Sequence, residues 1–299
     1  MKVTPPVTVT PAMLTSSTVA EPAAGETAWT SGTYAVGDVR IVVAQHRKYQ
    51  CILAGSSTIS PELDATRWTD IGPTVRWAMF DLLRNSASTA TSTMSVVLTP
   101  GQRIDSIGLV GLQASAVTVT VKVGATVHYT RTVSTIKRAT TSWYTYFFGA
   151  FRYLPSFILY DLPPITGCTI TLDFTGSAIQ CGGVVMGRSV DLGKVVGEPI
   201  SGATNYSRIE RDTFGNVTLV QRRSVPKTSQ KLLVDKSQVD ALRALRSDLN
   251  AVPALWSGLD DKSSDGYFES LLVFGIYKTF DIPLTHTYNA TVTLDLEEM

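Results

Sequence analysis

The most regular pattern along the chain is an alternation of apolar and polar residues. Residues 117–123 place Val at every second position, residues 170–174 alternate Ile, Leu and Phe with Thr and Asp, and residues 292–296 alternate Val and Leu with Thr and Asp. Successive side chains of a strand point to opposite faces of a sheet. Each segment therefore predicts a strand with one face in a core and the other toward solvent.

Shorter apolar runs, bounded by Pro, Gly or Ser, predict further strands around these segments. They lie at residues 94–98, 104–112 and 179–186. Short strands separated by turn signals are typical of a β-sandwich, so residues 73–200 are predicted to form a central, jelly-roll-like sandwich. Strands are also predicted near residues 39–44, 48–53, 217–220 and 270–277.

The last third of the chain contains one segment with helical spacing. Ser237 can cap the start of this helix, Asp240 favours the helix dipole, and Pro253 ends the helix. The positions with helical spacing are Val239, Leu242, Leu245 and Leu249. Residues 201–299 are therefore predicted to form a C-terminal α+β domain with one helix, and the whole chain is predicted to be mainly β.

The first 72 residues divide into two segments of different composition. Residues 1–27 are rich in Thr, Pro, Ala and Val, with almost no charge, and their prolines limit any strand ladder. They predict an extended N-terminal arm laid against a neighbouring chain, because exposed apolar residues are sticky. Residues 28–72 have dense turn signals and aromatic residues, and predict a separate small β module that leans on the rest of the chain.

The composition narrows the possible functions. Only 17% of the residues are charged and the formal net charge is +1, against about 25% charged residues in an average soluble domain. A nucleic-acid binder is disfavoured, because its affinity rests on many phosphate-neutralising Lys and Arg residues. Acidic residues dilute the basic residues of segment 205–236, which favours a solvated or interface-facing surface there.

The cysteines bear on disulfide bridges, and the N-terminal residues bear on secretion. Cys51, Cys168 and Cys181 are widely spaced and odd in number, unlike the even, dense set of a disulfide framework, although one bridge stays open. The N-terminus has no basic region followed by an apolar region, so we expect no secretory signal and a start in a cytoplasm. No apolar run reaches about 18 residues, so we expect no membrane span.

Motifs of the common hydrolases are missing from the sequence. It contains no G-x-S-x-G elbow, no H-E-x-x-H motif and no D-x-x-D-x-D-x-E strand of the chitinase type. His46, His128 and His286 lie far apart in the sequence. Residues 260–269 hint at a calcium loop, but the bidentate Glu at the right register is missing. We therefore expect neither enzymatic activity nor a cofactor or metal.

The strongest local motif lies in the small module. It reads Ala28-Trp29, then Tyr34, Gly37-Asp38 and Val39, then Tyr49-Gln50-Cys51, Pro61 and Trp68. This order resembles the small carbohydrate-binding modules of families 5 and 12 that are attached to chitinases and cellulases. The resemblance implies that Trp29, Tyr34, Tyr49 and Trp68 are carbohydrate-binding residues.

Two roles stay open for these four aromatic residues. Exposed rings would cover the C–H faces of sugar rings at low entropic cost. A module of about 45 residues also needs large side chains for its own core, and the same rings can supply it. The sequence does not distinguish a sugar platform from a core.

A second resemblance spans nearly the whole chain and rests on the order of its segments. They are PPVTVTPAMLTSSTVAEP (5–22), the module, PTVRWAMFD (73–81), GLVGLQASAVTVTV (108–121), YSRIERDTFGNVTLVQR (206–222) and LLVFGIYKTFDIPLTHTYNATVTLDLEE (271–298). In this order they resemble a family of tailed-bacteriophage tail or baseplate proteins. The resemblance implies a virion component that is assembled in the host cytoplasm with other tail proteins and copies of itself, and that attaches to a host cell-surface polysaccharide. The alternatives are a polysaccharide-processing enzyme and a free-standing glycan-binding protein.

Overall fold

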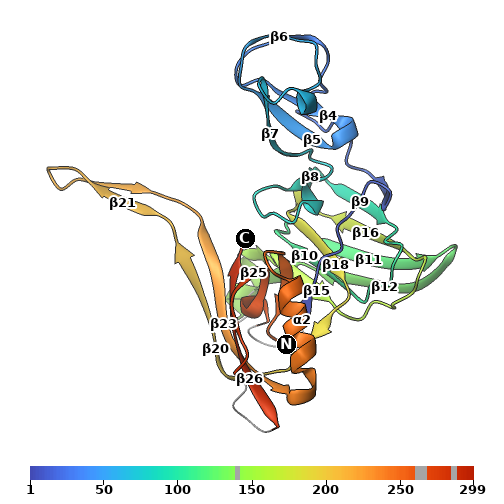
Figure 1. Cartoon of the computed structure of the whole chain (residues 1–299), viewed down its shortest axis with the longest axis vertical. Coiled ribbons are helices and arrows are strands. Elements are labelled where there is room, and N and C mark those ends of the chain that lie inside the picture. The colour runs from blue at the N-terminus through green and yellow to red at the C-terminus, as the bar shows by residue number, and fades with distance from the viewer. Residues whose placement is uncertain (139–141, 260–267, 284–287) are drawn as a thin grey trace.

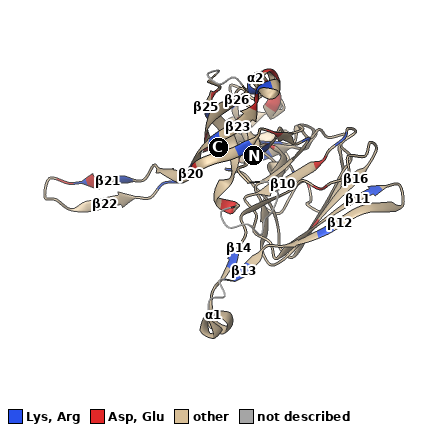
Figure 2. Cartoon of the chain, turned by 90° about the horizontal axis from the view of Figure 1, so that it is seen from below, with Lys and Arg blue, Asp and Glu red and all other residues tan. Residues whose placement is uncertain are grey.

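A computed structural model of the chain describes residues 1–138, 142–259, 268–283 and 288–299 (Figure 1). The described chain is mainly β, and its named strands pair antiparallel. The predicted fold class is confirmed, with α2 (Val239–Asp248) in the C-terminal region. Three β layers and this helix stack on one another, and the small module and two hairpins project from the stack (Figure 1, Figure 2).

The first two layers form the central sandwich. One sheet has the order β12 (Thr126–Ser134), β11 (Ala116–Val123), β16 (Thr169–Thr175), β9 (Thr93–Leu98) and β2 (Leu14–Ser17). The other has the order β15 (Ser156–Leu159), β10 (Ser106–Val110) and β18 (Gly183–Gly187). The alternating apolar residues of β11, β16 and β9 pack on Ile107, Leu109, Phe157 and Met186 in one large core. The alternation in the sequence therefore located the buried face correctly.

The three-stranded sheet is buried on both faces. Its second face carries Val110, Ile158 and Val185, which pack on Leu255 and Phe274 of the C-terminal region. The two sheets approach so closely at Gly108 that a methyl group there would overlap the Leu255 side chain. This continuous burial explains why β10, β15 and β18 are apolar runs rather than alternating strands.

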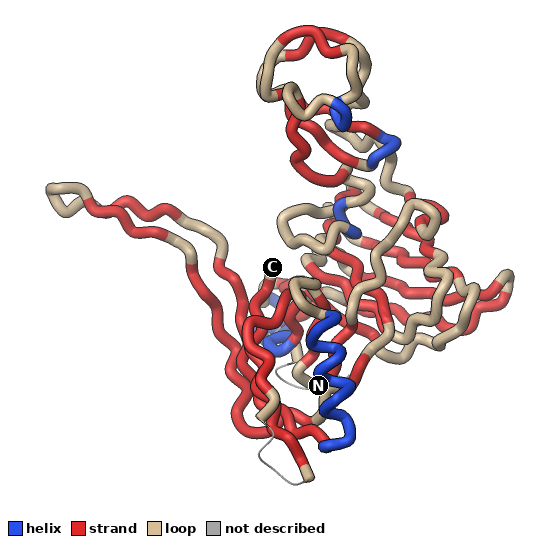
Figure 3. Tube along the Cα trace, viewed as in Figure 1, coloured by secondary structure: helices blue, strands red, loops and turns tan. Residues whose placement is uncertain are grey.

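The third layer is a seven-stranded sheet. Its order is β19 (Val190–Asp191), β1 (Lys2–Thr4), β24 (Ala254–Ser257), β25 (Leu272–Asp281), β26 (Asn289–Glu298), β23 (Ser224–Asp235) and β20 (Lys194–Asn205). Helix α2 covers the face of this sheet that points away from the sandwich, through Leu242 and Leu249 (Figure 3). The helix begins one residue later than expected: Ser237 lies inside a 3-10 turn (Lys236–Gln238), and Gln238 precedes α2 without a side-chain cap.

The N-terminal segment pairs with two sheets of its own chain. Strand β1 pairs with β24, with Val3 opposite Trp256, and β2 pairs with the edge strand β9 of the sandwich. Met1 and Val3 are buried in the core beneath α2. Part of the apolar surface that predicted an arm laid against a neighbouring chain is thus covered by sheets of the same chain, whose pairing strands lie far away in sequence.

The small module contains two little sheets. One pairs β3 (Gly32–Tyr34) with β6 (Gly55–Ser57), and the other has the order β4 (Val39–Val42), β5 (Arg47–Cys51) and β7 (Trp68–Pro73). A short pair, β8 (Ser88–Ala90) with β17 (Ile179–Cys181), lies beside the sandwich. Figure 1 shows the module standing at one end of the molecule.

Two hairpins leave the layered body. The first consists of β13 (Ile136–Arg138), α1 (Trp143–Phe148) and β14 (Phe151–Tyr153). The second continues β20 and β23 outward into β21 (Arg208–Arg211) and β22 (Val217–Val220). Figure 2 shows these two hairpins pointing in different directions. Helix α1 was not predicted from the sequence.

Candidate interaction surfaces

The four aromatic residues singled out in the small module form its core. Tyr34, Tyr49 and Trp68 are buried together with Cys51, and the half-buried Trp29 packs against them. Trp68 is only 2% exposed. Its ring meets Tyr34 edge-on at 4.9 Å between centroids, and its Nε1 donates to Ser57 Oγ at 3.1 Å. The arrangement favours the core role over the sugar-platform role.

No other ring of the module can replace these residues as a sugar platform. Residues 28–72 are all described, and they contain no further Trp, Tyr or Phe. The exposed apolar side chains of the module are aliphatic: Val36, Val39, Val43, Ile52, Leu53, Ile59, Leu63 and Ile71. Aliphatic side chains lack the flat aromatic face that suits stacking.

A buried contact joins the module to the sandwich. The Glu21 carboxylate accepts a hydrogen bond from Thr74 Oγ1 at 2.6 Å and lies 3.0 Å from His46 Nδ1. The His46 ring stacks on Trp77 at 4.4 Å between centroids. These contacts fix the base of the β4–β5 turn against the sandwich, so the module is held on the body through its His46 turn.

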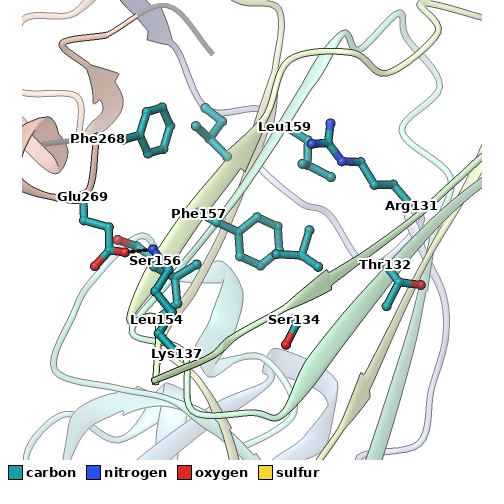
Figure 4. Close-up of a pocket in the computed structure, with 12 residues that line it drawn as sticks. Arg131, Thr132, Ser134, Lys137, Leu154, Ser156, Phe157, Leu159, Phe268 and Glu269 are labelled. Atoms are coloured by element: carbon teal, nitrogen blue, oxygen red, sulfur yellow. Dashed lines mark hydrogen bonds and ion pairs between the residues drawn. The ribbon is translucent and has the colours of Figure 1, made fainter. Parts of the chain in front are cut away.

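Two hollows between described residues lack the features of an active site. One hollow of about 230 Å³ lies between β12, β15 and residues 268–269 (Figure 4), which is below the size usual for small-molecule sites. Its ionisable groups are engaged in ion pairs: Lys137 pairs with Glu269 across the hollow, and Arg131 pairs with Asp161, outside the lining, at 2.8 Å. A second hollow of about 440 Å³, beside β8 and β17, has no ionisable side chain in its lining.

The described residues also offer no metal cluster. Nowhere in them do three or more His, Cys, Asp or Glu side chains gather closely enough to hold an ion. The candidate calcium loop at residues 260–269 falls largely outside the described residues, as does His286. Cys51, Cys168 and Cys181 are buried free thiols, so the bridge left open by the sequence does not form. Burial raises the pKa of Cys181 to about 12, which keeps its thiol protonated and inert.

The β20–β23 hairpin forms a long ribbon, which we call the β-ribbon (residues 201–226). Strand β23 pairs with β26 only from Lys227 onward, so in the described structure β20 and β23 continue without a third strand beyond that point. Asp212 shapes the tip, because its carboxylate accepts hydrogen bonds from the backbone N–H groups of Phe214 and Asn216. The pKa of Asp212 is lowered first by the hydrogen bond that the Asn216 side-chain amide donates to it at 2.7 Å, and further by these backbone bonds.

One face of the β-ribbon carries three apolar side chains together with Arg211, and we call it the apolar face; polar side chains predominate on the other face. Ile209 lies opposite Leu219, and Arg211 lies opposite Val217; opposite residues and residues two apart share a face. The other face carries Arg208, Glu210 and Thr218 together with Val220, and Arg208 forms an ion pair of 3.2 Å with Glu210. The apolar side chains are exposed, Leu219 at 66% and Phe214 at the tip at 89%. A two-stranded hairpin is marginal on its own in water, so this face is suited to a partner.

The β13–α1–β14 hairpin, which we call the aromatic hairpin (residues 136–138 and 142–153), exposes another apolar surface. Its seven aromatic residues are all exposed: Trp143, Tyr144, Tyr146, Phe147, Phe148, Phe151 and Tyr153. Sequence reasoning missed this surface, although the run WYTYFF at residues 143–148 could have marked it.

In the described part of the chain, no helix is both long and apolar enough to cross a membrane. Comparisons of the chain with protein-family models, with curated proteins and with solved structures give no match.

Proposed function

We propose that the chain is a structural component of the tail tip or baseplate of a tailed bacteriophage. In this role it assembles with other tail proteins and with copies of itself through non-covalent contacts. The resemblance of the ordered segments supports the phage assignment. One of those segments, residues 206–222, is the outer part of the β-ribbon.

The observation that carries the assembly role is the apolar face of the β-ribbon. Exposed contiguous apolar surface on a soluble chain marks an interaction site. Ile209, Val217 and Leu219 have no layer of their own chain over them. A neighbouring subunit would cover this face and stabilise a two-stranded hairpin that is marginal alone.

The contacts at the base of the β-ribbon support its use as a structural connector. Arg84, on the sandwich side, and Arg223, at the base of the ribbon, both pair with the buried Glu298 carboxylate, the latter at 3.7 Å. Burial raises the pKa of Glu298 although both arginines oppose this rise. These two ion pairs tie the base of the β-ribbon to the layered body.

Host attachment through the module is a weaker part of the resemblance. The rings that the resemblance assigns to sugar binding lie in the module core. The proposal is therefore restricted to assembly. Binding of the module to a polysaccharide is one of the readouts for the Trp68→Ala variant.

Mass spectrometry of purified phage particles tests the proposal. We expect the chain in particles, and a strong loss of incorporation when Ile209→Ser and Leu219→Ser are combined. Each buried aliphatic side chain contributes about 1.5–3 kcal/mol, so two of them change the affinity by about 100-fold or more. The matched control, Glu210→Gln with Thr218→Ser on the polar face, should incorporate normally. Absence of the wild-type chain from particles contradicts the phage role, and equal incorporation of both double variants contradicts the role of the apolar face.

A further inference from the structure

The aromatic hairpin presents rings on every side of a short helix. Trp143 and Phe148 are the most exposed of them, at 79% and 74%. The rings contact one another along α1: Trp143 stacks on Phe147 at 6.4 Å, and Tyr144 lies 5.2 Å from Phe148. None of these rings belongs to a hydrophobic core cluster of the described chain.

A helix that is apolar all round requires surroundings that are apolar all round. A flat protein interface would cover one face of α1 and leave the opposite rings in water. The interface of a lipid bilayer surrounds an inserted element, and Trp and Tyr are the residues that concentrate at this depth. The side chains of α1 fit that chemistry, since Trp143, Tyr144, Tyr146 and two Phe residues leave Thr145 as the only other residue.

The charges of the aromatic hairpin fit an anionic surface. Residues 106–160 contain Lys and Arg but no Asp or Glu, and Lys137, Arg138 and Arg152 lie in the two strands below α1. Figure 2 shows basic residues on β13 and β14 and none on α1. Lys137 pairs with Glu269, and Arg138 is used inside the hairpin, 4.2 Å from the Phe151 ring. Arg152 is exposed beside them.

The hairpin is built to hold α1 away from the body. Ser142 and Thr145 form a capping box at the start of the helix, and the Arg138 guanidinium donates to the Tyr146 carbonyl oxygen. Strands β13 and β14 carry α1 outward from the sheets (Figure 2).

We propose that the aromatic hairpin inserts into the interfacial region of a bilayer containing anionic lipids. The rings of α1 enter the headgroup–acyl boundary, and Arg152 contacts the negatively charged headgroups. This contact lies in the plane of the membrane and is not a span. It stands apart from the proposed assembly role, which rests on the β-ribbon.

Co-sedimentation of the full chain with lipid vesicles tests this inference. We expect binding to vesicles of phosphatidylcholine with phosphatidylglycerol that weakens with added salt. Binding to phosphatidylcholine alone should be weaker. Trp143→Ser combined with Phe148→Ser should lower partitioning about tenfold or more, because two large apolar side chains are lost. Arg152→Gln should lower binding to the anionic vesicles about fivefold and leave binding to neutral vesicles unchanged.

The matched control removes two exposed rings elsewhere. Tyr206→Ser with Phe214→Ser on the β-ribbon should leave vesicle binding unchanged. The inference is overturned if the wild-type chain binds no vesicles, or if the control double variant loses binding as much as the hairpin variant. It is also overturned if the hairpin variant keeps vesicle binding but is no longer incorporated into particles, because the hairpin is then a protein contact. Failure of vesicle binding leaves the test of the β-ribbon unaffected.

Discussion

Replacing Trp68 by Ala should unfold the small module and leave the sandwich folded. Trp68 is buried, contacts Tyr34 edge-on and donates a hydrogen bond to the buried Ser57. Truncating a buried Trp costs about 3–5 kcal/mol. At about 0.05–0.15 kcal/mol per residue, a module of this size has about 2–7 kcal/mol of stability in all. The expected loss is therefore comparable with the whole stability of the module.

Hydrogen–deuterium exchange read by mass spectrometry separates the two parts of the chain. In the Trp68→Ala variant we expect residues 32–57 to exchange as an unfolded segment while β11 and β16 stay protected. Trp68→Phe keeps a ring in the core, so the module should stay folded with a smaller loss of stability. A Trp68→Ala module that stays protected but no longer binds chitin or cellulose refutes the reasoning, because Trp68 then acts as an exposed platform.

Three further predictions concern the buried thiols, the Tyr129 hydroxyl and a close backbone contact at Gly187. The three cysteine thiols, all buried, should not react with Ellman's reagent at about pH 8 until the chain is denatured. Burial raises the pKa of the Tyr129 hydroxyl to about 12, and its hydrogen bond to Asp161 adds to this rise. The protonated hydroxyl therefore contributes to the free energy of unfolding below about pH 10, the ordinary pKa of tyrosine. That contribution is lost as the pH rises to 12. Denaturation at several pH values should therefore show a smaller alkaline loss in Tyr129→Phe than in wild type. In Gly187→Ala the added methyl group would overlap the carbonyl oxygen of Pro5. Urea denaturation should show a free energy of unfolding lowered by about 1–3 kcal/mol. The control Gly202→Ala places its methyl group next to the flexible Lys227 side chain and should lower the free energy of unfolding less.

The strands could be predicted where local pattern and tertiary burial agree. The alternating segments became β11, β16 and β26, each with the apolar set inside. The pairing of the N-terminal segment could not be predicted, because Val3 pairs with Trp256, which lies near the other end of the sequence. Short-range patterns carry no information about such distant partners.

The candidate surfaces were harder to predict for three physical reasons. A Trp or Tyr is equally suited to a miniature core and to a sugar platform, so the sequence left the role of Trp68 open until its burial was known. Helix α1 was not predicted because six residues are too few to show helical periodicity. Its residues are apolar on all sides, so no alternation of an apolar and a polar face marks the helical spacing. The β-ribbon was recognised only as the strand at residues 217–220, since alternation over four residues does not show that the pair leaves the sheet.

Imaging of the intact phage particle at a resolution that traces this chain tests the central claim most directly. The proposed function predicts the chain in the tail tip or baseplate, with Ile209, Val217 and Leu219 of the β-ribbon covered by a neighbouring subunit. A complete tail without this chain, or a β-ribbon whose apolar face stands in solvent in the assembled particle, would contradict it.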